Sequence, residues 1–504
     1  MIRLIERAKD FKNRTAVVSN GASYSYGQLL EASRNVAANL LDGKDDLNEA
    51  RITFLVPPSF EYTAVQWGIW AAGGIAVPLC VLHPLPSIQY VLEDTQAEIV
   101  IAHKDYIGFL KPLEATIGIS VTALESVLKE NTTSLPDIDS RRRAMILYTS
   151  GTTNRPKGVV TTHDNIEAQI TTLVDAWEWH KEDYILNILP LHHVHGIINV
   201  MGCALWSGAC CEFLPKFDAE KVWEIFKSGR LTLFMAVPTI YYKLISFWEK
   251  AAAEEQKKMS KAASKLRLMV SGSAALPVPV LQKWKEITGQ TLLERYGMTE
   301  IGMGLSNSYR GERRPGHVGL PLPGVQMRLV DSNDETVGEN EPGEFQIKGP
   351  SVFKEYWKKQ EATRKAFTED GWFITGDIGM LNDGLYKILG RDSVDIIKSG
   401  GYKISALEIE DVLRKHELVD DCAVVGLPDD EWGEVVSACI VSKKDTVDFK
   451  QISEWLKTQL PAYKIPRNYI VRNGLPRNVL GKVTKNEVKE MWPPLTPPKG
   501  ENAR

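Results

Sequence analysis

Short apolar runs alternate with longer amphipathic stretches through the first two thirds of the chain. Apolar runs of this length predict buried strands, and the apolar spacing of Phe60–Ala72 predicts a helix between two of them. The runs that predict strands are Arg51–Val56, Ile75–Leu79, Ala97–Ala102, Ala144–Thr149, Ile185–Leu189, Leu231–Ala236 and Leu266–Val270. Strand–helix–strand alternation indicates an α/β fold whose parallel sheets are covered by helices on both faces.

The pattern changes after about Leu320. Short strands separated by Gly, Asn and Asp turns predict a small β-rich subdomain, and they are Val325–Val330, Gly343–Lys348 and Gly384–Leu389. The last part of the chain predicts an α+β domain, with a helix at Ala406–Lys415, a strand at Asp421–Gly426 and a helix at Lys450–Gln459. The charged stretch Lys250–Lys265 predicts a solvated helix or loop. The Pro-rich end, residues 493–504, predicts a disordered tail.

Composition indicates a globular protein with more than one domain. The chain has 504 residues, of which 43% are hydrophobic and 25% charged. This length predicts several folding units, and the composition excludes a disordered, collagenous or fibrous chain. Because 60 basic residues stand against 64 acidic ones, we expect no general nucleic-acid surface, although a local basic pocket is compatible with this balance.

Cysteine usage and the first residues indicate an intracellular protein. The six cysteines include no C-x-x-C pair, which predicts reduced thiols in a reducing compartment. The charged segment Met1–Arg7 has the features of neither a signal peptide nor a transit peptide. The longest apolar stretch, Gly68–Leu82, is interrupted by glycines and a proline and is too short to cross a bilayer. These features predict a cytoplasmic location and no membrane span.

The strongest local signal is Tyr148–Gly158, where a predicted strand runs into hydroxyl side chains, glycines and a lysine. Small residues let backbone N–H groups turn toward an anion, hydroxyls add donors, and Lys157 adds positive charge. The segment therefore predicts a polyphosphate site, with a flexible hairpin loop as the alternative. It lacks the spacing of the Walker P-loop, because neither Ser nor Thr follows Lys157.

Thr149–Gly158 resembles the phosphate-binding signature of the adenylate-forming superfamily, which includes acyl-CoA synthetases, firefly luciferase and peptide-synthetase adenylation domains. The other signatures follow in the family's order, and the resemblance covers roughly residues 24–488. It implies that residues 1–391 form a large N-terminal domain of parallel α/β subdomains with the β-rich subdomain. Asp392 and Ser393 would form a hinge, and residues 394–492 a mobile α+β domain. The pivot is commonly Asp or Lys in the family, so Ser393 departs from the pattern.

The resemblance also implies a nucleotide site. Tyr296–Glu300 matches a signature in which the aromatic ring packs on adenine, Thr299 contacts phosphate and Glu300 helps to hold Mg²⁺, for which a carboxylate is a suitable ligand. Ser271–Pro277 resembles the strand end against which adenine lies. The residues expected to bind ATP or AMP are Thr149, Ser150, Gly151, Thr152, Thr153, Lys157, Gly272, Ser273, Ala274, Tyr296, Gly297, Met298, Asp377, Arg391 and Lys482. Of these, Asp377 would hold the ribose, and Arg391 would approach the ribose and α-phosphate.

Two more signatures lie near the C-terminus. Lys398–Ser405 resembles the segment that lines the CoA channel, where glycines allow close approach by the pantetheine arm. The CoA-binding residues expected from it are Lys398, Gly400, Gly401 and Tyr402. Pro476–Val483 matches the signature whose lysine, here Lys482, bridges carboxylate and ATP. The resemblance implies a two-step ligation, in which an acyl-adenylate forms with release of pyrophosphate and then reacts with CoA. The catalytic residues that it implies are Lys482, Thr299, Glu300 and His193.

Pro190–Gly196 contains three of the nine histidines within four residues. Neighbouring cysteine or acidic ligands are missing, so we favour a polar wall of the acyl pocket over a metal site. The resemblance places His193 at the family's pocket position, with His195 as an additional polar wall.

Arg295 stands at a position that borders the acyl pocket in the family. A buried arginine needs an anionic partner, and a carboxylate at the far end of the substrate would supply one with bidentate geometry. Residues 292–300 resemble malonyl-CoA synthetases, and residues 313–319 and 390–406 fit that narrower family. Arg313 is a second candidate partner of the distal carboxylate. The alternatives are a salt bridge from Arg295 to a protein acid and one from Arg313 to Glu312.

The resemblance thus implies an ATP-dependent malonate–CoA ligase that releases AMP and pyrophosphate, with Mg²⁺ as cofactor and ATP and CoA as co-substrates. Its partners would be small molecules and not nucleic acid, and it would be a monomer or homodimer. The alternatives are a ligase for methylmalonate, another short acid, or an aryl or medium-chain acid, a non-catalytic nucleotide-binding regulator, and a phosphotransferase or NTPase. The joint presence of the expected catalytic and nucleotide-binding residues weighs against a regulator, and the missing Walker signature weighs against an NTPase.

Overall fold

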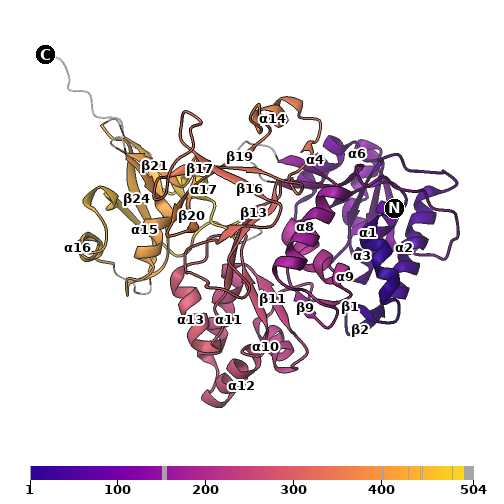
Figure 1. Cartoon of the computed structure of the whole chain (residues 1–504), viewed down its shortest axis with the longest axis horizontal. Coiled ribbons are helices and arrows are strands. Elements are labelled where there is room, and N and C mark those ends of the chain that lie inside the picture. The colour runs from indigo at the N-terminus through magenta and orange to yellow at the C-terminus, as the bar shows by residue number, and fades with distance from the viewer. Residues whose placement is uncertain are drawn as a thin grey trace. The chain divides into compact units, whose positions relative to one another are not determined.

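The computed structural model describes residues 2–149, 156–399, 402–429, 431–442, 444, 447–478 and 481–492. The chain divides into two compact units (Figure 1). The larger unit contains the described residues up to 276, together with 280–328 and 346–375. The smaller unit contains 277–279, 329–345 and the described residues from 376 onward. The predicted tail, 493–504, lies outside the described residues.

A seven-stranded sheet in the larger unit has the order β18-β8-β7-β4-β3-β5-β6. The strands from β7 to β6 run parallel, whereas β8 is antiparallel to both β7 and β18. The strands are β3 Arg51–Leu55, β4 Ile75–Pro78, β5 Ile99–Ala102, β6 Ser120–Ala123, β7 Arg143–Thr149, β8 Lys157–Thr162 and β18 Glu355–Tyr356. The four strands predicted in this region are confirmed, while the antiparallel β8 was not expected.

A nine-stranded sheet has the order β15-β14-β13-β12-β11-β9-β10-β1-β2. It is parallel from β13 to β1 and ends in antiparallel pairs at both edges. Its strands are β1 Thr15–Ser19, β2 Ala22–Ser25, β9 Tyr184–Asn187, β10 Cys210–Phe213, β11 Leu233–Ala236, β12 Leu268–Ser271, β13 Leu293–Met298, β14 Gly302–Ser306 and β15 Leu320–Pro321. The predicted parallel α/β architecture is confirmed.

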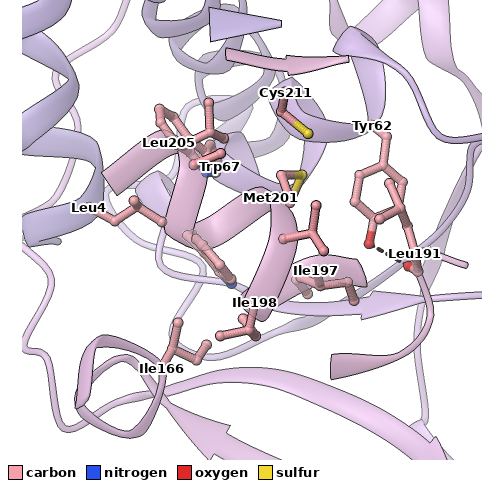
Figure 2. Packing of buried hydrophobic residues seen from close by; sticks show 14 of the residues in the cluster. Leu4, Tyr62, Trp67, Ile166, Leu191, Ile197, Ile198, Met201, Leu205 and Cys211 are labelled. Carbon is pink, nitrogen blue, oxygen red and sulfur yellow. Dashed lines mark hydrogen bonds between the residues drawn. The ribbon is translucent and has the colours of Figure 1, made fainter. Parts of the chain in front are cut away.

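Helices cover both faces of these two sheets. One set shares a single hydrophobic core with both sheets, and it comprises α1 Arg3–Ala8, α2 Tyr26–Leu41, α3 Phe60–Ala71, α7 Leu124–Val127, α8 His163–Ala176, α9 Cys203–Ser207 and the π-helix η2 His195–Gly202. Side chains alternate along β4, so that Ala76 faces this core while Ile75 and Val77 face the opposite side. Figure 2 shows Trp67 of α3 and Met201 of η2 within the shared core.

The outer faces carry separate helices. The seven-stranded sheet is covered by α4 Leu85–Thr95, α5 Lys104–Leu110 and α6 Pro112–Ile117. The nine-stranded sheet is covered by α10 Ala219–Lys227, α11 Pro238–Lys250, α12 Ala253–Ala263 and α13 Val278–Thr288. The stretch Lys250–Lys265, predicted as a helix or loop, contains the helix α12, which buries Met259 and Ala263.

The region predicted to be β-rich forms a four-stranded sheet of order β16-β17-β19-β20. Its strands are β16 Gln326–Val330, β17 Gly343–Lys348, β19 Phe373–Asn382 and β20 Leu385–Arg391, and the helix α14 Gln360–Lys365 precedes β19. The β-rich prediction is confirmed.

The C-terminal part of the smaller unit is an α+β domain, as predicted. In its sheet, of order β22-β21-β24-β23, β25 also pairs with β24. The strands are β21 Ile396–Ser399, β22 Tyr402–Ser405, β23 Val419–Asp429, β24 Gly433–Ser442 and β25 Asn468–Arg472. Helices α15 Ala406–Leu413 and α16 Phe449–Lys457 pack on one face, and α17 Lys485–Glu490 packs on the other. Within the described ranges, no helix has both the length and the apolar character needed to cross a bilayer.

Candidate active site

The carboxyl ends of β12 and β13 bring several of the predicted residues together. Strand β12 ends at Ser271 and leads into residues 272–274, and Arg295 lies on the neighbouring β13. His195, the first residue of η2, approaches this edge, with its Nδ1 atom 3.1 Å from Oγ of Ser273. Ser273 has a φ of 67°, a left-handed backbone that side chains rarely adopt and that is enriched at functional sites. Open α/β sheets bind ligands at such strand ends.

Arg295 is a buried cation. The residue is 5% exposed, and its Nε and Nη2 atoms have no hydrogen-bond partner among the described residues. Burial lowers the pKa of Arg295 to about 9, because the charged form loses its hydration. The adjacent carboxylate of Glu294 instead accepts a hydrogen bond from the backbone N–H of Gly316 at 3.0 Å. Within the described ranges no ion pair joins Arg295 to a protein acid, and a buried guanidinium without an anionic partner is costly.

Gly272 and His195 shape the surroundings of Arg295. A Cβ atom at position 272 would lie 2.3 Å from Cζ of Arg295 and 2.4 Å from its Nε. Burial, and then the neighbouring charges of Arg295 and His193, lower the pKa of His195. A neutral imidazole therefore adds polarity beside the guanidinium without adding a second positive charge.

His192 and His193 form a second polar group, which His83 joins from the loop after β4. The ring centroid of His192 lies 4.1 Å from that of His193 and 5.9 Å from that of His83. Burial lowers the pKa of His83 and of His192. The hydroxyl of Tyr62 donates to the carbonyl of Leu191 at 2.6 Å and fixes the start of this segment (Figure 2). In the described part of the chain, no group of three His, Cys, Asp or Glu side chains is arranged to hold a metal.

The predicted phosphate loop joins β7 to β8. Thr149 and Lys157 are paired across these antiparallel strands, so the hairpin brings its two ends together. Ser150, Gly151, Thr152 and Thr153 lie outside the described residues. The ammonium group of Lys157 lies 4.9 Å from the ring centroid of Tyr356, within the range of a cation–π interaction.

Glu300 meets the same tyrosine. The carboxylate of Glu300 is buried, and the hydroxyl of Tyr356 donates to its Oε1 atom at 3.0 Å. Because β18 pairs with β8, Tyr356 connects the phosphate hairpin to the Tyr296–Glu300 segment. The ring and hydroxyl of one residue thus orient a predicted phosphate-binding lysine and a predicted Mg²⁺ ligand.

The Tyr296–Glu300 segment begins on β13 and turns into β14. Gly297 pairs with Met303 at a register shift, and a Cβ atom at Gly297 would lie 2.1 Å from the carbonyl oxygen of Gly302. Only glycine allows this close approach of backbone. Tyr296 is 7% exposed, whereas Met298 and Thr299 are partly exposed at the end of the strand.

In the smaller unit, Asp377 and Arg391 face each other across β19 and β20. They are register partners, and Nε of Arg391 lies 3.7 Å from Oδ1 of Asp377. The backbone N–H of Asp392 donates to the carbonyl of Gly376 at 3.0 Å. Asp392 also pairs with Lys398 at 3.2 Å, and Ser393 is exposed. The hinge role of Asp392 and Ser393 stays a prediction.

The predicted CoA segment connects β21 to β22. Ser399 is the register partner of Tyr402, while Gly400 and Gly401 lie outside the described residues. Tyr402 is 56% exposed and stacks on Tyr463 with a centroid distance of 4.6 Å. Lys482 lies on a hairpin closed by the backbone bond from the N–H of Asn478 to the carbonyl of Lys482 at 2.9 Å.

Arg313 is bound to backbone carbonyls. Its guanidinium donates to the carbonyls of Thr291 at 2.6 Å and Tyr309 at 2.8 Å, and to that of Ser308 at 3.3 Å. These bonds fix the guanidinium against the backbone, and its role as the second partner of a distal carboxylate stays a prediction. The alternative bridge from Arg313 to Glu312 is wrong, since Glu312 pairs with Arg314.

Known families match both parts of the chain. Residues 4–357 match the AMP-binding enzyme family, and residues 408–482 match the AMP-binding enzyme C-terminal domain. The chain belongs to the AMP-binding enzyme family.

Relatives in this family are similar over nearly the whole chain. The chain is 45% identical to the mitochondrial malonate–CoA ligase ACSF3 of Xenopus laevis, over 97% of this chain and 91% of the relative. It is 39% identical to the malonate–CoA ligase of Arabidopsis thaliana, over 95% and 86%. The crystal structure of ATP-bound MatB from Rhodopseudomonas palustris matches with a TM-score of 0.89 at 33% identity, covering 97% of this chain and 98% of that one.

Within this AMP-binding enzyme, the larger unit joins the predicted residues into two groups. One comprises Lys157 and Glu300 around Tyr356, and the other comprises His195 and Arg295 beside residues 272–274. Tyr356 and His83 were not predicted from the sequence. Tyr356 belongs to a two-residue strand, which is too short to produce a periodic pattern, and an isolated histidine such as His83 carries no spacing signal.

The contact between Gly272 and Arg295 gives a prediction for the AMP-binding enzyme. In Gly272→Ala, the new methyl group should displace the guanidinium, which is the flexible end of a side chain, and should leave the strands in place. We expect the KM for the acid substrate to rise about tenfold, with a loss of stability of about 1 kcal/mol. Steady-state kinetics and thermal unfolding measure the two effects. A change in ATP KM of the same size would contradict a local effect on the acyl pocket.

Proposed function

We propose that the protein is a malonate–CoA ligase that acts through malonyl-adenylate. A carboxylate oxygen of malonate attacks the α-phosphorus of ATP, and the bond to pyrophosphate breaks. The CoA thiolate then attacks the carbonyl carbon of the adenylate, and AMP leaves. The observation that carries the choice of acid is the buried guanidinium of Arg295, which has no partner among the described residues. Malonate brings a second carboxylate to meet it, and relatives named malonate–CoA ligases are 39% to 45% identical to the chain.

The described side chains would have separate roles in adenylate formation. Arg295 would bind the distal carboxylate, while the neutral His195 supplies a polar wall that does not compete for it. Two anionic reactants must meet, so the positive charges of Lys157 and Lys482 would lower their repulsion and position them. Glu300, whose carboxylate Tyr356 orients, has the chemistry to hold Mg²⁺. When bound, Mg²⁺ would neutralise charge on the ATP phosphates.

A panel of acids tests the proposed activity. The purified protein is assayed with ATP, Mg²⁺ and CoA, and with malonate, methylmalonate, succinate, propionate or butyrate. We expect AMP and pyrophosphate in equal amounts, and a kcat/KM for malonate at least about 100-fold above that for propionate, because malonate, unlike propionate, has a second carboxylate to pair with the buried cation. Release of ADP would contradict the adenylate route. A preference for propionate or butyrate would contradict the choice of malonate.

The pKa of Arg295 predicts a pH dependence for malonate binding. Burial lowers this pKa to about 9, so the guanidinium is charged below that pH and loses its proton above it. We expect the KM for malonate to be level below pH 9 and to rise up to about tenfold per pH unit above it. The measurement is KM for malonate from pH 7 to 10, with propionate as the control acid. An identical rise for propionate would assign the effect to another group.

A further inference from the structure

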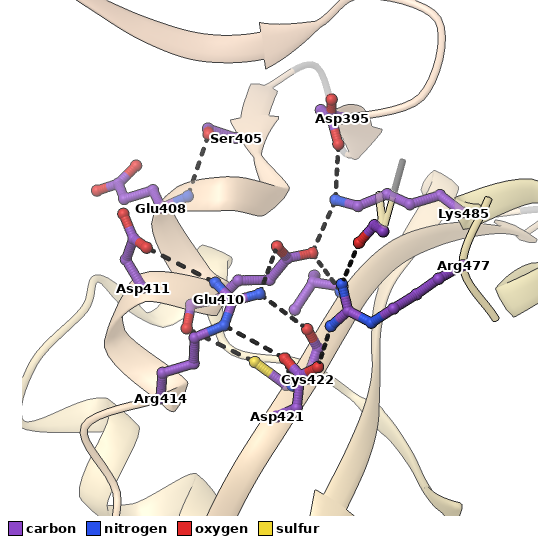
Figure 3. Close-up of polar contacts among 12 residues, drawn as sticks. Asp395, Ser405, Glu408, Glu410, Asp411, Arg414, Asp421, Cys422, Arg477 and Lys485 are labelled. Atoms are coloured by element: carbon purple, nitrogen blue, oxygen red, sulfur yellow. Dashed lines mark hydrogen bonds and ion pairs between the residues drawn. The ribbon is translucent and has the colours of Figure 1, made fainter. Parts of the chain in front are cut away.

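A buried ion triad lies directly after the hairpin that carries Lys482. The ammonium group of Lys485, at the start of α17, lies 2.7 Å from Oδ1 of Asp395 and 2.7 Å from Oε1 of Glu410 (Figure 3). The side chains of Lys485 and Glu410 are 7% and 5% exposed. Although burial acts in the opposite direction, the two carboxylates raise the pKa of Lys485, so its ammonium group stays charged.

Asp395 connects this triad to Arg391. While its Oδ1 atom meets Lys485, its Oδ2 atom accepts a hydrogen bond from the backbone N–H of Arg391 at 3.1 Å. The backbone N–H of Asp395 returns a bond to the carbonyl of Arg391 at 2.7 Å. Gly390 allows this tight turn, because a Cβ atom there would lie 2.3 Å from Cβ of Asp395. One carboxylate therefore binds both Lys485 and the backbone of a predicted nucleotide-binding residue.

The opposite side of the hairpin is linked to α15, the helix that carries Glu410. Arg477 forms an ion pair with Asp421, and Asp421 lies 3.5 Å from Nε of Arg414 (Figure 3). Arg414 in turn donates to Oε2 of Glu410 at 3.3 Å. Both ends of the hairpin that bears Lys482 thus reach Glu410 on α15.

We propose that Asp395, Lys485 and Glu410 are positioning residues that hold Lys482 in register with Arg391 during adenylate formation. This inference rests on the proposed function. Buried ion pairs contribute little net stability compared with apolar residues, and a role in registry is their best-attested use. The first half-reaction requires the ammonium group of Lys482 between two anions while Arg391 approaches the α-phosphate. A misplacement of about 1 Å can cost about 100-fold in such a step.

The test compares Lys485→Met with Lys485→Arg, and uses Lys489→Met as the matched control. Lys489 lies on the same helix, and its one ion pair within the described ranges is a long contact of 3.8 Å with Glu434. For Lys485→Met we expect adenylate formation, measured as pyrophosphate release, to slow by about 30- to 100-fold. Thioester formation from synthetic malonyl-adenylate and CoA should change less than about threefold. Lys485→Arg should recover most of the rate of adenylate formation, and Lys489→Met should match the wild type in both half-reactions.

Hydrogen exchange of the backbone amides of residues 477–478 and 481–484 gives a readout that needs no substrate. Lys485→Met should speed exchange in these residues more than in β23 and β24, whereas general destabilisation would speed it throughout the unit. Because Lys485→Met removes the cation shared by Asp395 and Glu410, the triple variant with Asp395→Asn and Glu410→Gln is measured alongside it and should show the same selective loss.

Two results would overturn the inference: equal losses in both half-reactions, or unchanged adenylate formation in a folded variant. The proposed function is checked separately by the acid preference of the wild type. If the wild type prefers another acid, the same two half-reactions are measured with that acid, so an error in the choice of malonate leaves this test intact.

Discussion

Replacing Lys482 by alanine should abolish most adenylate formation and spare the second half-reaction. The family signature places this lysine between carboxylate and ATP, where its charge lowers the repulsion of two anions. Removing one such electrostatic contact costs roughly 100- to 1,000-fold in kcat. We therefore expect pyrophosphate release with ATP and malonate to fall by that factor in Lys482→Ala. Synthetic malonyl-adenylate should still react with CoA at a rate close to that of the wild type.

The control is stability, because the backbone bonds and the bond from Arg477 to the carbonyl of Gly481 that brace the hairpin remain in Lys482→Ala. Thermal unfolding of the variant should match the wild type within about 1 kcal/mol. Equal losses in the two half-reactions would refute the role assigned to Lys482.

Arg295→Ser should change the preferred acid. Its guanidinium is the buried cation at the end of the proposed acyl pocket, and truncating one partner of a buried charge pair costs about 2–5 kcal/mol. The kcat/KM for malonate should therefore fall by about 100- to 1,000-fold. Propionate and butyrate should lose little or gain, because a serine no longer demands an anion. The measurement is kcat/KM for each acid under the same conditions.

Arg313→Gln serves as the comparison for Arg295→Ser. Since Arg313 donates to the main-chain carbonyls of Thr291, Ser308 and Tyr309, its removal should affect malonate and propionate alike. An unchanged acid preference in Arg295→Ser, or a malonate-specific loss in Arg313→Gln, would contradict the proposal that Arg295 binds the distal carboxylate of malonate.

The parallel parts of the fold were predictable because buried strands leave continuous apolar runs. The runs around Ile75 and Ile101 coincide with β4 and β5. Strand β8 was missed, although Lys157–Thr162 contains a β-branched pattern, because the preceding glycines and hydroxyls suggested that the loop extended through Gly158. The π-helix η2 was also missed, since its apolar residues are buried all round and give no one-sided periodicity.

The candidate site was predictable where a motif fixes residue types at fixed spacing. Arg295 was singled out because it immediately precedes the Tyr296 signature, at a position that borders the acyl pocket in the family, and the structure buries it. The roles of Tyr356 and Lys485 could not be predicted from the sequence. Their importance comes from partners that are distant in sequence, Glu300 for the tyrosine and Asp395 and Glu410 for the lysine. Only the folded chain brings these groups within hydrogen-bonding distance.

The contact between Gly272 and Arg295 makes the effects of substitutions at these two positions depend on each other. A side chain larger than hydrogen at position 272 takes the space of the guanidinium, so it should cost less in a chain that has already lost Arg295. The effects of substituting both positions should therefore be strongly non-additive, as expected for residues in direct contact. A redesign of the acyl pocket toward neutral acids should therefore lose less stability when the arginine is replaced first and the glycine second.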